Sequence, residues 1–192
     1  MRCISATVVV VIGTLIAQVS AKSESNVQTA AVKEVSTNGF QIEMSIPVKS
    51  KSTDVYDCFV KNVADWWDKS HTFTADSRNL KIEAKPHGWF LETLPDGGFV
   101  RHFEIVYLAP GKTIRLNGGM GPLQEHGVAG SMTINFKPIN EKTSSIELTY
   151  NVGGFIPGGQ ETFKQWAPIV KQVIMEQMER LRDYAQKPAS DR

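Results

Sequence analysis

The sequence predicts an α+β domain in which a curved antiparallel sheet grips one long C-terminal helix, with the element order β-α-β6-α. Two observations carry this prediction. Short segments typical of strands, separated by turn residues, fill the middle of the chain, and an apolar stripe at helical spacing runs from Phe163 to Ala185. A long helix with one apolar face must bury that face, and a twisted antiparallel sheet offers a concave surface for it.

Residues 1–21 are predicted to be a cleaved secretory signal. Arg2 gives a positive start, an apolar run extends from Ile4 to Ile16, and small residues end at Ala21. The apolar run is shorter than the roughly 20 residues that cross a bilayer. We therefore expect a periplasmic or extracellular protein without stable membrane insertion after cleavage.

The charge balance and the cysteines narrow the class of protein. Cleavage would remove Arg2 alone from the 21 Lys and Arg, against 20 Asp and Glu, so the mature chain is formally neutral. Because nucleic-acid binding depends on a basic surface, we expect no nucleic-acid partner. Cys58 would be the only cysteine left, which excludes an intrachain disulfide.

The elements follow in order along the chain. Residues 22–37 are polar and predict a flexible tether, residues 38–187 the domain, and residues 188–192 a disordered tail. Alternation from Phe40 to Ile46 predicts a half-buried strand.

A helix is expected next, capped by Ser52 or Thr53 and extending to Trp66. Cys58 lies on its apolar stripe, so we interpret it as a packed thiol. Six strands joined by turns then precede the last helix: Leu80–Ala84, Gly88–Leu94, Phe99–Leu108, Thr113–Asn117, Ser131–Lys137 and Ser145–Val152.

Four stretches carry a family resemblance: "DVYDCFVKNVADWWDKSHTF", "GWFLETLPDGGFVRHFEIVYLAPGKTIRL", "NGGMGPLQEHGVAGSMTINF" and "SIELTYNVGGF". With the last helix, they resemble the START-like, or SRPBCC, superfamily of helix-grip domains. Within it they are similar to the polyketide-cyclase-like branch named after the C-terminal domain of activators of the heat-shock protein 90 ATPase. The resemblance covers most of residues 38–186. It implies a cavity between the sheet and the last helix for a small apolar or amphipathic molecule.

Phosphate and metal sites lack support in the sequence. The "GKT" at Gly111 has Val106 where a P-loop needs glycine, and a dinucleotide fingerprint from Gly119 would need glycine where Gln124 stands. The four histidines are scattered and form no metal-ligand spacing. We expect no metal and no cofactor.

The hairpin around Asp96-Gly97 holds the candidate acid–base residues. A two-residue turn there would place Glu92 opposite Arg101, as a surface ion pair, and Phe90 opposite Phe103. His102 and Glu104 would then share the other face, among apolar residues. Their polar groups would be satisfied either by neighbouring side chains or by a ligand.

The glycine-rich segment Asn117–Gly130 has two interpretations. It is either a flap that closes over a ligand, with glycine hinges, or a packed loop that seals a dry core. Likewise, His71 is either a surface residue or a polar group at a pocket mouth. The candidate ligand-binding residues are Trp67, His71, Trp89, His102, Leu123, Gln124, Tyr150 and Trp166.

Three functions are compatible with these features. The preferred hypothesis is an exported domain that binds a small apolar or amphipathic molecule. The alternative is a cyclase- or hydrolase-type enzyme in which His102 acts as the general base, oriented by Glu104. A protein-interaction module, similar to a co-chaperone, is the third, although export would separate it from a cytosolic partner and ATP.

Overall fold

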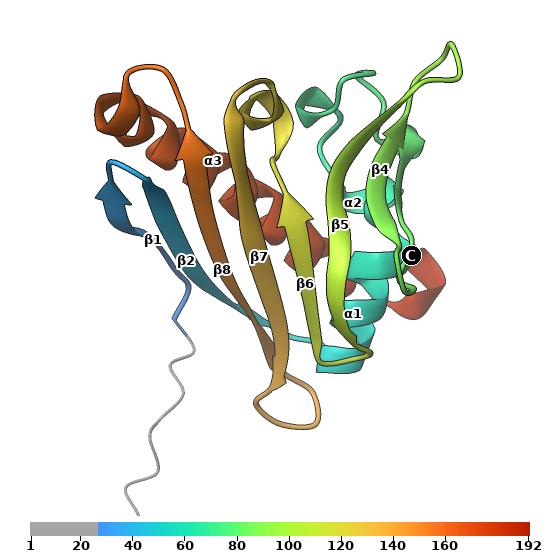
Figure 1. Ribbon diagram of the computed structural model, residues 1–192. Helices are drawn as coiled ribbons and strands as arrows, with labels where there is room; N and C mark the ends of the chain where they lie inside the picture. The colour runs from blue at the N-terminus through green and yellow to red at the C-terminus, as the bar shows by residue number, and fades with distance from the viewer. Residues whose placement is uncertain (1–26) are drawn as a thin grey trace, which may run out of the picture.

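The computed structural model describes residues 27–192 and confirms the predicted α+β architecture (Figure 1). Within these residues, eight strands form one antiparallel sheet in the order β1-β2-β8-β7-β6-β5-β4-β3. The strands are β1 Thr29–Ser36, β2 Gly39–Val48, β3 Leu80–Ile82, β4 Trp89–Thr93, β5 Phe99–Ala109, β6 Thr113–Gly118, β7 Gly127–Pro138 and β8 Ser144–Phe155.

The helices lie on one side of this sheet. In Figure 1, α3 crosses behind the strands, and α1 and α2 lie near the end of the sheet that β4 and β5 occupy. The α-helices are α1 Ser52–Lys61, α2 Val63–Trp66 and α3 Gly159–Ala185, and the short 3-10 turns are η1 Lys69–His71, η2 Ser77–Asn79, η3 Gly121–Glu125 and η4 Ala189–Asp191. None of the helices in residues 27–192 is long and apolar enough to cross a membrane.

Burial of one face of α3 against the sheet forms the core. Phe163, Ala167, Ile174 and Leu181 recur at helical spacing and are almost fully buried. Phe163 meets Phe40 of β2 edge to face, with 6.0 Å between ring centroids. The inward residues of the strands supply the other half of the core because successive side chains of a strand point to opposite faces.

The predicted first helix is divided into two. At Asn62 the backbone leaves helical geometry (φ −122°, ψ 23°), which ends α1 and starts α2 in a new direction. The indole Nε1 of Trp66 then donates to the Cys58 carbonyl, 3.0 Å away, and both residues are buried. Burial of the Cys58 thiol is thereby confirmed.

Both ends of the described chain correct the sequence prediction. Thr29–Ser36, expected in a flexible tether, forms strand β1 and pairs along β2. The sequence shows no sustained alternation there because a register shift between Val32 and Glu34 interrupts the period of this edge strand. The expected disordered tail forms the turn η4, and the Arg192 guanidinium donates to Cys58 Sγ at 3.1 Å. The predicted signal, residues 1–21, lies outside the described residues.

Candidate functional site

A half-enclosed cavity of about 420 Å³ opens between α3, the β6–β7 connection and the segment after α2. Its rim includes Phe73 and Ile169, each 56% exposed although both are large and apolar. The wall consists mainly of apolar side chains. The full lining is Trp67, Ser70, His71, Thr72, Phe73, His102, Met120, Gly121, Pro122, Leu123, Trp166, Ile169, Val170 and Val173.

The β4–β5 hairpin determines which polar side chains reach this cavity. Its turn has three residues rather than two, because the Leu94 N–H donates to the Gly98 carbonyl at 2.9 Å. Gly97 completes the turn in the left-handed region, at φ +84°, where glycine is favoured. Thr93 therefore lies opposite Phe99, one residue away from the predicted register.

A β-bulge then restores the register further along the hairpin. Leu91 pairs with Arg101 and Phe90 with Phe103, so His102 is the extra residue between two paired positions. The predicted pairing of Phe90 with Phe103 is thus confirmed, whereas that of Glu92 with Arg101 is wrong. The three-residue turn and the bulge together turn Glu92 and His102 to the same side of the hairpin.

Glu92 and His102 form a buried polar pair in the cavity wall. The Glu92 carboxylate is fully buried, and its Oε2 lies 3.4 Å from His102 Nε2. The expected pairing of His102 with Glu104 is wrong, because Glu104 lies on the outer face of the sheet. There its carboxylate is 3.8 Å from the Arg101 guanidinium, and both side chains are partly exposed.

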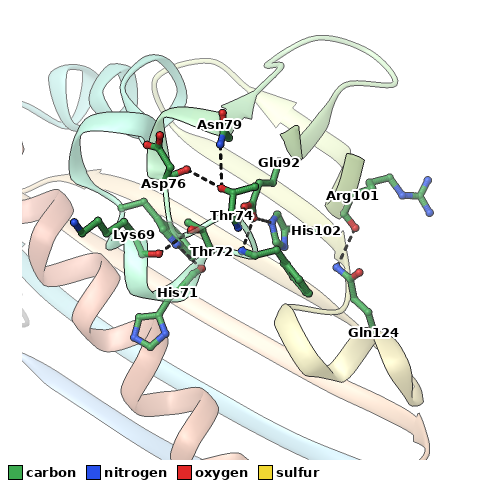
Figure 2. Close-up of polar contacts among 12 residues, drawn as sticks. Lys69, His71, Thr72, Thr74, Asp76, Asn79, Glu92, Arg101, His102 and Gln124 are labelled. Atoms are coloured by element: carbon green, nitrogen blue, oxygen red, sulfur yellow. Dashed lines mark hydrogen bonds and ion pairs between the residues drawn. The ribbon is translucent and has the colours of Figure 1, made fainter. Parts of the chain in front are cut away.

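The same carboxylate holds the segment that forms one side of the cavity. Glu92 accepts hydrogen bonds from the backbone N–H groups of Phe73, at 3.1 Å, and Thr74, at 2.7 Å. Figure 2 shows Glu92 between His102 and this segment. A buried carboxylate with three donors is satisfied, and it fixes the backbone that presents Phe73 to the cavity.

The His102 imidazole is in its neutral form near neutral pH. Burial lowers its pKa below the ordinary value, an effect that the neighbouring Glu92 opposes in part. Nε2 faces Glu92, and Nδ1 has no hydrogen-bond partner among residues 27–192. His102 lines the cavity, so a ligand bound there can contact its ring.

His71 lies on the opposite side of the cavity from the Glu92–His102 pair. Its Nε2 is 3.7 Å from the Glu176 carboxylate of α3, and its ring points toward that helix in Figure 2. The indole Nε1 of Trp67 donates to the His71 carbonyl at 3.1 Å, which fixes the Trp67 ring in the wall. The structure thus brings five predicted site residues to one cavity: Trp67, His71, His102, Leu123 and Trp166.

Three other predicted site residues do not line this cavity. Trp89 stacks on Phe99, with 6.0 Å between ring centroids, on the outer face of the hairpin. The hydroxyl of the buried Tyr150 donates to the Gly118 carbonyl at 3.1 Å. The Gln124 amide nitrogen donates to the carbonyls of Gly119, at 2.9 Å, and Arg101, at 3.1 Å. The polar groups of Tyr150 and Gln124 therefore form hydrogen bonds with the protein's own backbone.

The glycine-rich segment is a packed loop that also forms a wall. β6 continues to Gly118 and β7 begins at Gly127, so only residues 119–126 connect them. Leu123 is fully buried, and Gln124 ties the loop to the β5 backbone. The structure favours the packed loop over the mobile flap, but the loop does not seal a filled core, because Met120 to Leu123 face the cavity.

Comparisons with known proteins agree on the fold. No family model and no curated protein matches the chain. Truncated norcoclaurine synthase from Thalictrum flavum is similar in structure, with a TM-score of 0.54 and 10% identity over 84% of this chain and 96% of that one. A conserved protein of unknown function from Enterococcus faecalis gives 0.53 and 12% over 84% and 78%. The chain has the helix-grip fold.

The helix-grip cavity includes residues that the sequence analysis did not select. These residues include Phe73, Met120, Val170 and Val173, because no signal separates a cavity wall from a core in one sequence. Gln177 lines a smaller space next to the cavity, and it is a polar residue within the apolar stripe of α3. A polar residue in an apolar stripe can be recognised from the sequence, so Gln177 could have been selected as a candidate.

No metal site is visible in the described part of this helix-grip domain. Residues 27–192 contain no group of three or more His, Cys, Asp or Glu side chains placed to hold a metal ion. The two histidines at the cavity are each paired with a single carboxylate, Glu92 or Glu176.

Proposed function

We propose that this protein binds a small, largely apolar molecule in the helix-grip cavity. The observation that carries the proposal is the cavity itself, whose volume of about 420 Å³ falls within the range of small-molecule sites. Trp67, Leu123 and Trp166 give it broad apolar contact. One complex of norcoclaurine synthase, which shares the fold with a TM-score of 0.52, contains a transition-state analogue.

The polar groups of the cavity favour an amphipathic ligand. Ser70, Thr72 and the His71–Glu176 pair lie on one side, and His102 Nδ1 can accept a hydrogen bond. Few convergent polar groups within an apolar wall are typical of sites that orient a ligand. The cavity also argues against a pure interaction module, which has no need of an internal cavity.

A cavity-filling variant tests the proposal. Val170 is buried on α3 and faces the cavity, so Val170→Phe should occupy space that the ligand needs. We expect phenylnaphthylamine, which fluoresces in apolar sites, to bind the wild type and to bind Val170→Phe at least about tenfold more weakly. Val106→Phe, at a 52% exposed position of β5, is the matched control and should bind as the wild type does.

Either of two results would contradict the proposed binding in this cavity. If the wild type gives no saturable fluorescence, or if Val170→Phe folds and binds the probe normally, the cavity is not the binding site.

An enzyme in the same cavity is the second candidate, and the Glu92–His102 pair favours it. A neutral, buried imidazole oriented by a carboxylate is the arrangement of a general base. Naphthyl acetate tests this directly, because its hydrolysis releases fluorescent naphthol. Turnover that is lost in His102→Gln while phenylnaphthylamine binding persists would support an enzyme. Absence of wild-type turnover would leave this hydrolase without support.

We also propose membership of the polyketide-cyclase-like branch, on the motif around Trp66-Trp67 and the glycine-rich loop. If the solved members of that branch as a group superpose on residues 27–192 less well than norcoclaurine synthase does, this assignment is contradicted.

A further inference from the structure

Gln177 has an unusual environment deep inside the domain. Its side chain is fully buried on the sheet-facing side of α3, where every other buried residue except Tyr184 is wholly apolar. Among residues 27–192, its Nε2 is the one buried side-chain nitrogen or oxygen without a hydrogen-bond partner. An unsatisfied buried donor costs the fold about 1–3 kcal/mol, so its presence calls for an explanation.

The orientation of this amide is fixed by chemistry. Gln177 Oε1 accepts the backbone N–H of Asp68 at 2.8 Å. A backbone N–H can only donate, so the oxygen must face Asp68 and the NH₂ group must take the other position. Exchanging the oxygen and nitrogen of the Gln177 amide therefore cannot explain the unpartnered donor.

Gln177 lines a small void that continues the cavity inward. The void has a volume of about 10 Å³ and lies between α3 and the strands, lined by Phe103, Leu116 and Ile134 among others. Trp67 and Met120 belong to the walls of both spaces. Along α3, Val170 lines the cavity, while Ile174 and Gln177 line the void, at positions one and two turns further on.

Water is a poor partner for the Gln177 donor. The void is at the lower limit of the space that one water molecule needs, and its other lining residues are apolar or aromatic. A buried water needs two to four polar partners, so the amide alone would hold it weakly. A ligand group that brings its own hydrophobic contacts does not have this disadvantage.

We infer that Gln177 is the polar contact at the inner end of the cavity and that it recognises a neutral hydrogen-bond acceptor. This inference rests on the proposed binding function. The ligand class is an apolar molecule whose leading end carries a carbonyl, ether or similar oxygen. Met120 lines both the cavity and the void with a flexible, partly buried side chain, so its displacement would open a path inward.

A matched pair of ligands tests the inference. Acetylnaphthalene carries a carbonyl where isopropylnaphthalene, of similar shape, carries only carbon. The affinity of each is measured by competition with phenylnaphthylamine in the wild type, in Gln177→Met and in the control Gln165→Met. Gln165 lies on the exposed side of the same helix. We expect the preference for the ketone to fall about tenfold in Gln177→Met and to stay unchanged in Gln165→Met.

Comparing preferences, rather than single affinities, cancels the different solubilities of the two ligands. If both bind and the preference is equal in wild type and Gln177→Met, the role of Gln177 is overturned while the binding function stands. If neither ligand nor the probe binds the wild type, the proposed function fails, and this inference fails with it.

A second variant covers the case in which Gln177→Met does not fold. Gln177→Glu keeps an oxygen for the Asp68 N–H but, when ionised, offers the ligand no donor. Because burial in this apolar void raises the pKa of a glutamate, the variant is measured at a pH of about 10, where it is ionised, and it should then lose the ketone preference by a similar factor. Retention of the wild-type preference in Gln177→Glu would overturn the inference.

Discussion

Glu92 connects three parts of the molecule through one carboxylate. It lies on β4, it faces His102 of β5, and it accepts two backbone N–H groups from the segment that carries Phe73. Hydrogen bonds to an ionised acceptor are roughly twice as strong as neutral ones. Removal of this side chain would leave the buried His102 and two backbone N–H groups, of Phe73 and Thr74, without their partner.

We expect Glu92→Ala to destabilise the protein by about 3–5 kcal/mol, the usual cost of breaking a buried charged network. Denaturant unfolding of the purified protein measures this loss. Glu104→Ala, on the neighbouring strand but partly exposed, is the control and should change stability by no more than about 0.5 kcal/mol. Equal effects of the two substitutions would contradict the assignment of Glu92, rather than Glu104, as the buried partner of His102.

The sequence predicted the residues of this pair but not their partnership. His102 was selected because a histidine stood among apolar residues of one strand, and Glu92 was assigned to the surface. The error has two physical sources, the three-residue turn at Gly97 and the bulge at His102. Each shifts the register by one residue, and one residue moves a side chain to the other face of a strand.

At the scale of elements, the β6–β7 loop combines two functions. Its turn η3 places Leu123 in the core, while Met120 to Leu123 form one side of the cavity. Gly121 has φ +54° with open space around it, so the loop needs glycine there for its backbone rather than for room. The loop is thus built as a fixed wall.

Leu123→Ala should therefore cost about 2–5 kcal/mol, as for other buried leucines. Thermal or denaturant unfolding measures the change. Leu94→Ala, at a half-buried position beside the exposed β4–β5 turn, is the matched control and should cost less. An unchanged stability of Leu123→Ala would restore the alternative of a mobile flap.

The long elements were predictable and the short ones less so. The stripe of α3 and the alternation of β2 are strong periodic patterns, and both elements match their predictions. The edge strand β1 forms by pairing along β2, and Gln28, just before it, donates from Nε2 to Glu179 Oε1 of α3 at 2.6 Å. Such contacts leave no period in the sequence.

At the scale of the whole molecule, we propose that the protein is exported to the periplasm or the extracellular space. We expect the mature chain, purified from a secreting host, to start near Lys22 and to stay soluble without detergent, because cleavage removes the apolar run. N-terminal sequencing with fractionation measures both. Uncleaved chain in the membrane fraction would contradict export and cleavage.

The positions of the four tryptophans give the domain a built-in optical reporter. Trp67 and Trp166 line the cavity, and Trp66 contacts Trp67 with 5.6 Å between ring centroids. Trp89 lies apart, stacked on Phe99 on the outer face, and serves as an internal reference. Intrinsic emission should therefore change when a molecule enters the cavity, with no label attached. Libraries of colourless compounds can be screened on the unmodified protein in this way.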